Sequence, residues 1–217
     1  MRLVKHLENP QALRTWKTPL SNYACAIRPV AAIMITKIDG FDDLIEADHA
    51  AGMTLLTKSH KLQEYYLSHH GCTRVVKMGD TLLASFYSAA QAVQCAVKIQ
   101  RGAQKMFNHS LRIGIHMGEV RYVKDDLFGT PVNIASDIQQ LAKPGQVLVS
   151  ESVAGSIDSE LFAIGLQNSG ETHGLSLYQV KSRIKDETSY IGHADSVDTR
   201  SIESFNTWNA YAMVSGS

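Results

Sequence analysis

The sequence contains few cysteines, no long apolar run and no excess of charge of either sign. Its three cysteines, Cys25, Cys72 and Cys95, form no CxxC motif. An odd, unclustered set argues against a disulfide framework, so we expect a reducing compartment. No apolar stretch reaches the roughly 18 residues that a transmembrane helix needs. The sequence therefore predicts no membrane span.

The charge balance and the first residues narrow the class of protein further. Lys and Arg together number 21, as do Asp and Glu, so the formal net charge is zero. No overall basic field then favours nucleic acid or an anionic membrane. Residues 1–8 contain no apolar segment long enough for a signal peptide. We expect a cytoplasmic protein with no nucleic-acid partner.

Apolar runs separated by turn residues predict one α+β domain. Strands are predicted over 31–38, 73–78, 81–86, 111–116, 119–123, 146–149, 161–166 and 175–180. Helices are predicted over 42–69, 88–107, 130–142 and 150–156. This order favours a mainly antiparallel sheet with flanking helices. The domain is expected over 30–181, after an N-terminal lead-in (1–29) and before a polar C-terminal extension or tail (182–217).

Five short segments carry a resemblance to a known family. They are Ile38-Asp39-Gly40-Phe41, Gly79-Asp80, and the segments 111–120, 128–136 and 144–150. Each is weak alone, but their order and spacing resemble the class III adenylate/guanylate cyclase domain of bacterial type. The resemblance implies a ferredoxin-like core and a head-to-tail dimer with active sites at the interface, formed with a second copy or another cyclase-like domain. It also implies conversion of a nucleoside triphosphate to its cyclic monophosphate and pyrophosphate.

Metal binding is the first function that the resemblance puts in doubt. The family implies two divalent cations, Mg²⁺ or Mn²⁺, held by two carboxylates, because hard cations prefer oxygen ligands. The first carboxylate position holds Lys37, and the second holds Asp80. Asp39 is a candidate substitute ligand, with a simple turn as the alternative. The family backbone also predicts that Lys37 approaches Asp80 as an ion pair, in which case the domain needs no metal.

Nucleotide binding has a candidate site at the first turn after that strand. Gly40 and Phe41 match the family's phosphate-binding turn, whose helix N–H groups would face a triphosphate. The alternative is a helix capped by Asp42 or Asp43, and such a carboxylate would compete with phosphate. Both interpretations stay open at this point.

The groups that the family supplies from the dimer partner are also incomplete. Asn133 matches the transition-state Asn, but Asp137 stands where the family has an Arg. Asp126 matches the acidic base-reading position, with a solvated loop as the alternative. The Lys partner of that position is replaced by Val76, and only a β-bulge would turn Lys77 to the same face.

These replacements leave three interpretations, of which we favour the first. In the first, the chain is a catalytically degenerate cyclase domain that dimerises and acts as a regulatory or nucleotide-binding partner in cyclic nucleotide signalling. In the second, it is an active cyclase for ATP or GTP with altered metal ligands. In the third, it is a cyclase-fold scaffold that binds no nucleotide. The histidines, among them His70 and His116, are interpreted as surface or core residues and not as zinc ligands.

Overall fold

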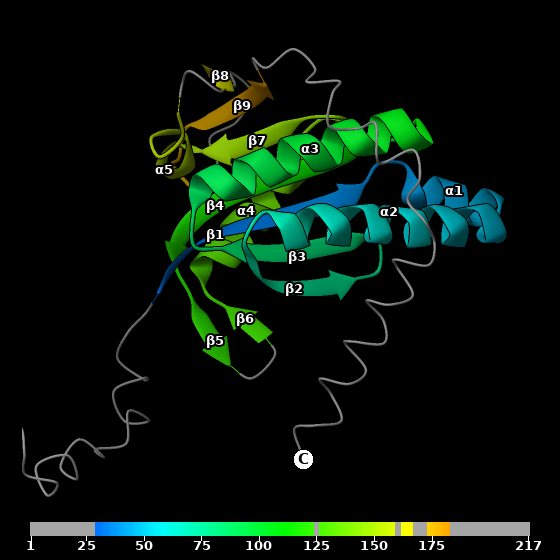
Figure 1. The fold of residues 1–217 in the computed structure, drawn as a ribbon, viewed down its shortest axis with the longest axis horizontal. Coiled ribbons are helices and arrows are strands. Elements are labelled where there is room, and N and C mark those ends of the chain that lie inside the picture. The colour runs from blue at the N-terminus through cyan, green and yellow to red at the C-terminus, as the bar shows by residue number, and fades with distance from the viewer. Residues whose placement is uncertain (1–28, 124–125, 159–161, 167–172, 183–217) are drawn as a thin grey trace, which may run out of the picture. The chain divides into compact units, whose positions relative to one another are not determined.

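A seven-stranded sheet forms the centre of the protein (Figure 1). The computed structural model describes residues 29–123, 126–158, 162–166 and 173–182. The first elements are β1 (Val30–Ile38), α1 (Phe41–Ala47), α2 (His49–His69), β2 (Cys72–Met78), β3 (Thr81–Phe86), α3 (Ala89–Phe107) and β4 (Leu111–Glu119). They are followed by β5 (Arg121–Val123), β6 (Asp126–Phe128), α4 (Thr130–Leu141), β7 (Val147–Ser150), α5 (Glu151–Ala154), β8 (Phe162–Leu166) and β9 (Leu177–Ser182).

The strand order confirms the predicted fold class. It is β2-β3-β1-β4-β7-β9-β8, and β5 pairs with β6 in a separate two-stranded sheet. β1 is antiparallel to both β3 and β4, while β4 and β7 are parallel. The part β2-β3-β1-β4, with helices α2 and α3 between its strands, is the ferredoxin-like core. None of the described helices is both long and apolar enough to span a bilayer.

Alternation along β1 separates two apolar layers, because successive side chains of a strand point to opposite faces. Met34 and Ile38 join the larger core, to which α2 and α3 contribute. Ile33 and Ile35 join a second cluster that includes Ala135 of α4. Figure 1 accordingly shows α2 and α3 in front of the sheet, with α4 behind it. Lys37 continues the Ile33–Ile35 series, so it belongs to the face that α4 covers.

Two predicted elements need correction. The single helix expected over 42–69 is two helices, because Asp48 adopts an extended conformation (φ −147°, ψ 98°) and ends α1. The Asp48 side chain then accepts a hydrogen bond from the Ala51 N–H and caps α2. The solvated loop that was one alternative at Asp126 is instead strand β6, whose backbone pairs with β5 in a hairpin.

A buried chain of polar side chains joins α2 to β1. The Thr36 hydroxyl donates to Gln63 Oε1 at 2.6 Å, and Gln63 Nε2 donates to Ser59 Oγ at 3.1 Å. Thr36 and Gln63 are fully buried and Ser59 is 3% exposed. These contacts hold α2 against Thr36, the residue that precedes Lys37.

Gln63→Leu is expected to lower the free energy of unfolding by about 1–3 kcal/mol, because the buried Thr36 hydroxyl loses its partner. Chemical denaturation measures this change. The double variant T36V/Q63L removes both partners and should recover part of the loss. Equal losses in the single and double variants would show that packing, and not the hydrogen bond, carries the effect.

Candidate functional site

Lys37 and Asp80 meet at one end of the central strands, as the sequence predicted. Lys37 lies near the end of β1, and Asp80 follows Gly79 in the turn between β2 and β3. The Ile38 N–H donates to the Asp80 carbonyl at 3.3 Å, which holds this turn against β1. Lys37 Nζ lies 3.7 Å from Asp80 Oδ2. An ammonium therefore faces the carboxylate where the family resemblance implies a shared cation.

Asp80 depends on this ammonium for its charge compensation. Its side chain is 15% exposed, and Oδ2 is buried without a hydrogen-bond partner among the described residues. The 3.7 Å separation from Lys37 Nζ is an ion-pair contact rather than a hydrogen bond. A buried carboxylate left without a counter-charge is costly. Lys37 thus supplies the positive charge that this position requires.

Asp39, the candidate substitute metal ligand, pairs with Arg112 of β4. Its Oδ1 accepts hydrogen bonds from the Arg112 guanidinium, at 2.7 Å from Nε and 2.6 Å from Nη2. Its backbone is held as well, since its N–H donates to the Ser110 carbonyl at 3.0 Å. His109 Nε2 lies 2.9 Å from the Asp39 carbonyl. One carboxylate oxygen of Asp39 thus accepts two charge-assisted hydrogen bonds from Arg112, which ties the end of β1 to β4.

The residues present do not fit the two divalent cations that the family implies. Among the described residues, no group of three or more His, Cys, Asp or Glu side chains could hold a metal ion. Asp80 is the one carboxylate left of the expected set, and Lys37 Nζ already faces it. A cation beside this ammonium would experience charge repulsion, about 4 kcal/mol for two unit charges at ~4 Å and an effective dielectric of 20. Mg²⁺ or Mn²⁺ is therefore disfavoured here.

The chain turns at Gly40 between β1 and α1, and Phe41 begins the helix. Gly40 has φ 66°, a left-handed conformation that favours glycine, and no side chain caps α1. The alternative of a cap by Asp42 or Asp43 is thereby corrected, since both lie inside the first turn. Asp42 instead binds Lys37, with Oδ2 at 3.3 Å from Nζ. Lys37 is thus shared between a buried carboxylate and an exposed one.

α4 presents Asn133 and Asp137 one helical turn apart. Asn133 is exposed, and Asp137 Oδ2 lies 2.7 Å from His173 Nε2. His173 occupies a turn before β9 with φ 57°, which is uncommon for a residue other than glycine. The family's arginine position therefore holds a carboxylate paired with a histidine. The pairing of Asp137 with His173 was not predicted, because 36 residues separate the two along the chain.

Lys77 lies on the face of the sheet away from α4, so no β-bulge turns it to the side of Val76. Val76 packs against the cluster that contains Ala135, whereas Lys77 forms an ion pair with Glu64 of α2. The register shift in the β2–β3 pairing lies between Cys72 and Arg74, too early to turn Lys77 to the other face. For Asp126 the structure describes the backbone in β6 but not the direction of the side chain.

His60 is a further residue near the turn that sequence reasoning missed. It lies on α2 beside the Gly79 carbonyl, and burial lowers the pKa of its ring, with Lys77 adding to the shift. Its Nε2 has no hydrogen-bond partner among the described residues. His116 is different, since its Nδ1 is hydrogen-bonded to Ser150 Oγ at 2.8 Å, and burial lowers its pKa. His60 is partly buried and His116 is buried, so His116 is a core residue, one of the two alternatives that the sequence left open for it.

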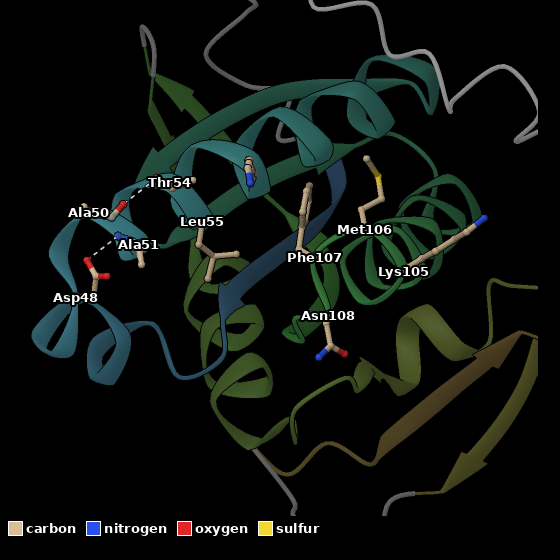
Figure 2. Close-up of a pocket in the computed structure, with 10 residues that line it drawn as sticks. Asp48, Ala50, Ala51, Thr54, Leu55, Lys105, Met106, Phe107 and Asn108 are labelled. Atoms are coloured by element: carbon tan, nitrogen blue, oxygen red, sulfur yellow. Dashed lines mark hydrogen bonds between the residues drawn. The ribbon is translucent and has the colours of Figure 1, made fainter.

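An open groove lies elsewhere, between the start of α2 and the end of α3 (Figure 2). Its lining includes Asp48, Leu55 and Phe107. Two polar groups at the start of α2 are engaged locally, since Asp48 caps the helix and the Thr54 hydroxyl donates to the Ala50 carbonyl. None of the family-matched residues lines it. The groove is therefore separate from the Lys37–Asp80 site.

Sequence comparison places these residues in a family context. A sequence model of the adenylate and guanylate cyclase catalytic domain matches residues 26–191. A Rhizobium meliloti (strain 1021) protein named "Putative adenylate cyclase 3" is 36% identical over 137 residues, covering 58% of this chain and 23% of that protein. An uncharacterized Mycobacterium tuberculosis protein is 31% identical over 115 residues, covering 50% of this chain and 45% of that protein. The chain thus spans less than half the length of these relatives.

Solved structures agree on the fold. The adenylyl cyclase CyaB from P. aeruginosa superposes with a TM-score of 0.65 at 18% identity, covering 72% of this chain and 96% of that chain. An adenylate/guanylate cyclase/hydrolase from Silicibacter pomeroyi gives a TM-score of 0.58 at 28% identity, covering 73% and 100%. With the family match over most of the chain and the strand order described above, the chain belongs to the adenylate and guanylate cyclase catalytic domain family.

Proposed function

We propose that the chain is a catalytically silent cyclase domain, which dimerises with a second cyclase-type domain and acts as a nucleotide-binding, regulatory partner in cyclic nucleotide signalling. The observation that carries the proposal is the Lys37–Asp80 ion pair at 3.7 Å. The reaction needs cations to hold the attacking oxygen and the triphosphate. An ammonium can donate hydrogen bonds to a phosphate oxygen, but it cannot coordinate and activate the attacking hydroxyl as a metal ion does.

Charge at the second half of the site supports the same proposal. A cation should meet negative charge that develops on the phosphate during cyclisation. Asp137 places a carboxylate at this position, and its histidine partner is itself held by that carboxylate at 2.7 Å. A homodimer would repeat both replacements in each of its two sites. The active-cyclase alternative is supported by Asp80 and Asn133, which match the family. An assay for formation of cyclic nucleotide decides between the two.

The surface of the β5–β6 hairpin supports the proposed dimer. Phe128 ends β6 with its side chain 51% exposed, next to the buried Leu127. Exposed aromatic side chains are enriched at protein interfaces, where a few of them carry most of the binding energy. A related fold, the guanylyl cyclase domain of the RhoGC fusion protein from Blastocladiella emersonii, is described as dimeric.

Phe128→Asp is expected to weaken self-association by about fivefold or more, because truncating a hot spot of an interface costs more than ~1 kcal/mol. Sedimentation velocity over a concentration series measures the change. Tyr87→Asp is the matched control, since Tyr87 is 71% exposed but follows β3 and is not part of the hairpin. A chain that stays monomeric at all concentrations, or equal effects of both variants, would contradict the proposed dimer surface.

A further inference from the structure

We propose that Lys37 itself is the cation that meets the phosphates of a bound nucleotide, and that Asp42 competes with those phosphates for it. The ligand class is then a metal-free polyphosphate, such as a free nucleoside triphosphate. This inference rests on the proposed function, because it assigns a binding mode to a domain that does not catalyse. It begins from the disagreement between the family's metal requirement and the residues present.

The two carboxylates around Lys37 differ in how firmly they hold it. Asp80 is 15% exposed and follows a turn that is bonded to β1, so it stays in place. Asp42 is 76% exposed, and Lys37 is 39% exposed. Exposed ion pairs contribute little free energy, because both partners are well solvated when they are apart. An incoming anion therefore displaces Asp42 at small cost, while Asp80 keeps Lys37 at the end of β1.

The chemistry of Lys37 suits a phosphate oxygen better than it suits a metal ion. A lysine ammonium is a compact point charge with three donors, and it binds phosphate in that form. A divalent ion at Asp80 would have to approach the carboxylate oxygen that Lys37 Nζ already faces at 3.7 Å. Free triphosphate carries more negative charge than its Mg²⁺ complex. The ammonium consequently favours the free form.

The acidic first turn of α1 predicts weak binding by the natural sequence. Lys37 pairs with Asp42 and Asp80, and Asp43 adds a further negative charge to the same turn. The local charge therefore opposes a polyphosphate as long as Asp42 retains Lys37. Asp42 thus competes with phosphate for the ammonium and also repels the phosphate. Asp43 only repels it.

The test compares Asp42→Asn with Asp43→Asn by isothermal titration calorimetry, using inorganic triphosphate and ATP as probes in EDTA. Each variant removes one exposed carboxylate from the same turn, but Asp42 alone of the two pairs with Lys37. D42N is expected to tighten binding about fivefold or more. D43N is expected to change the affinity about twofold or less, because solvent and salt screen the exposed charge that it removes. Excess Mg²⁺ should weaken binding of ATP to D42N.

Lys37→Met in the D42N background should abolish the gain. Equal tightening by D42N and D43N would overturn the proposal in favour of general electrostatics. Binding of ATP that requires Mg²⁺ would also overturn it, and either result leaves the proposed function standing. No binding by any variant would overturn this proposal together with the nucleotide-binding part of the proposed function. Catalytic silence is tested separately, by formation of cyclic nucleotide.

Discussion

The double variant K37D/D137R is expected to bind Mn²⁺ at least tenfold more tightly than the natural sequence. The first substitution removes the ammonium that lies 3.7 Å from Asp80 and adds a carboxylate, so the charge beside the metal position falls by two units. Each unit interaction at ~4 Å is worth about 1 kcal/mol in water and about 4 kcal/mol at an effective dielectric of 20. Calorimetric titration of Mn²⁺ into both proteins measures the difference.

The same variant should also raise formation of cyclic nucleotide above the level of the natural sequence. Asp137→Arg replaces the carboxylate near the phosphate by the cation that the transition state requires. His173 then faces an arginine instead of Asp137, so this half of the site must rearrange. Lys37→Ala is the control that separates loss of the ammonium from gain of a ligand. A folded double variant that neither binds Mn²⁺ more tightly nor gains activity would show that the family positions are assigned incorrectly.

Gly114→Ala is expected to be strongly destabilising, because α4 packs directly on this residue of β4. A Cβ at Gly114 would lie 2.3 Å from the Gln139 nitrogen and 2.6 Å from the Ala135 carbonyl oxygen. Both are backbone atoms of α4, so the helix must move as a whole to relieve the overlap. Overpacking typically costs 1–3 kcal/mol, and for contact with a helix backbone we expect about 3 kcal/mol or more.

Thermal unfolding should report this as a fall in Tm of about 10 °C. Gly165→Ala in β8 is the matched control, since a Cβ there meets nothing within 4 Å, and it should change stability by less than about 0.5 kcal/mol. Equal stability of the two variants would mean that α4 is not seated on β4 as described. Because α4 carries Asn133 and Asp137, its seating also sets where those residues point.

The sequence predicted the order of elements well, because apolar periodicity and turn residues are local signals. β1, the β2–β3 hairpin, α3 and α4 all lie within a few residues of their predicted bounds. The break between α1 and α2 was missed, since Asp48 is a helix cap whose effect depends on its extended backbone conformation. β6 was missed because a strand of three residues is too short for periodicity to identify.

The candidate site was predicted only where it depends on the backbone of the family fold. Lys37 approaches Asp80 because β1 and the β2–β3 turn converge in any protein with this core. The partners Arg112 of Asp39 and His173 of Asp137 were not predicted, since they are 73 and 36 residues away along the chain. Side-chain pairs of this kind depend on tertiary packing, to which a single sequence gives no direct access.

If the Lys37 ammonium takes the place of a catalytic cation, as we propose, the purified protein should make no cyclic nucleotide. The measurement is to incubate it with ATP or GTP and Mn²⁺, or Mg²⁺, and to quantify cyclic AMP and cyclic GMP. We expect no cyclic nucleotide above a reaction without protein, with either nucleotide and either metal. Robust formation of cyclic AMP or cyclic GMP would contradict the proposal and would establish the chain as an active cyclase with an altered metal site.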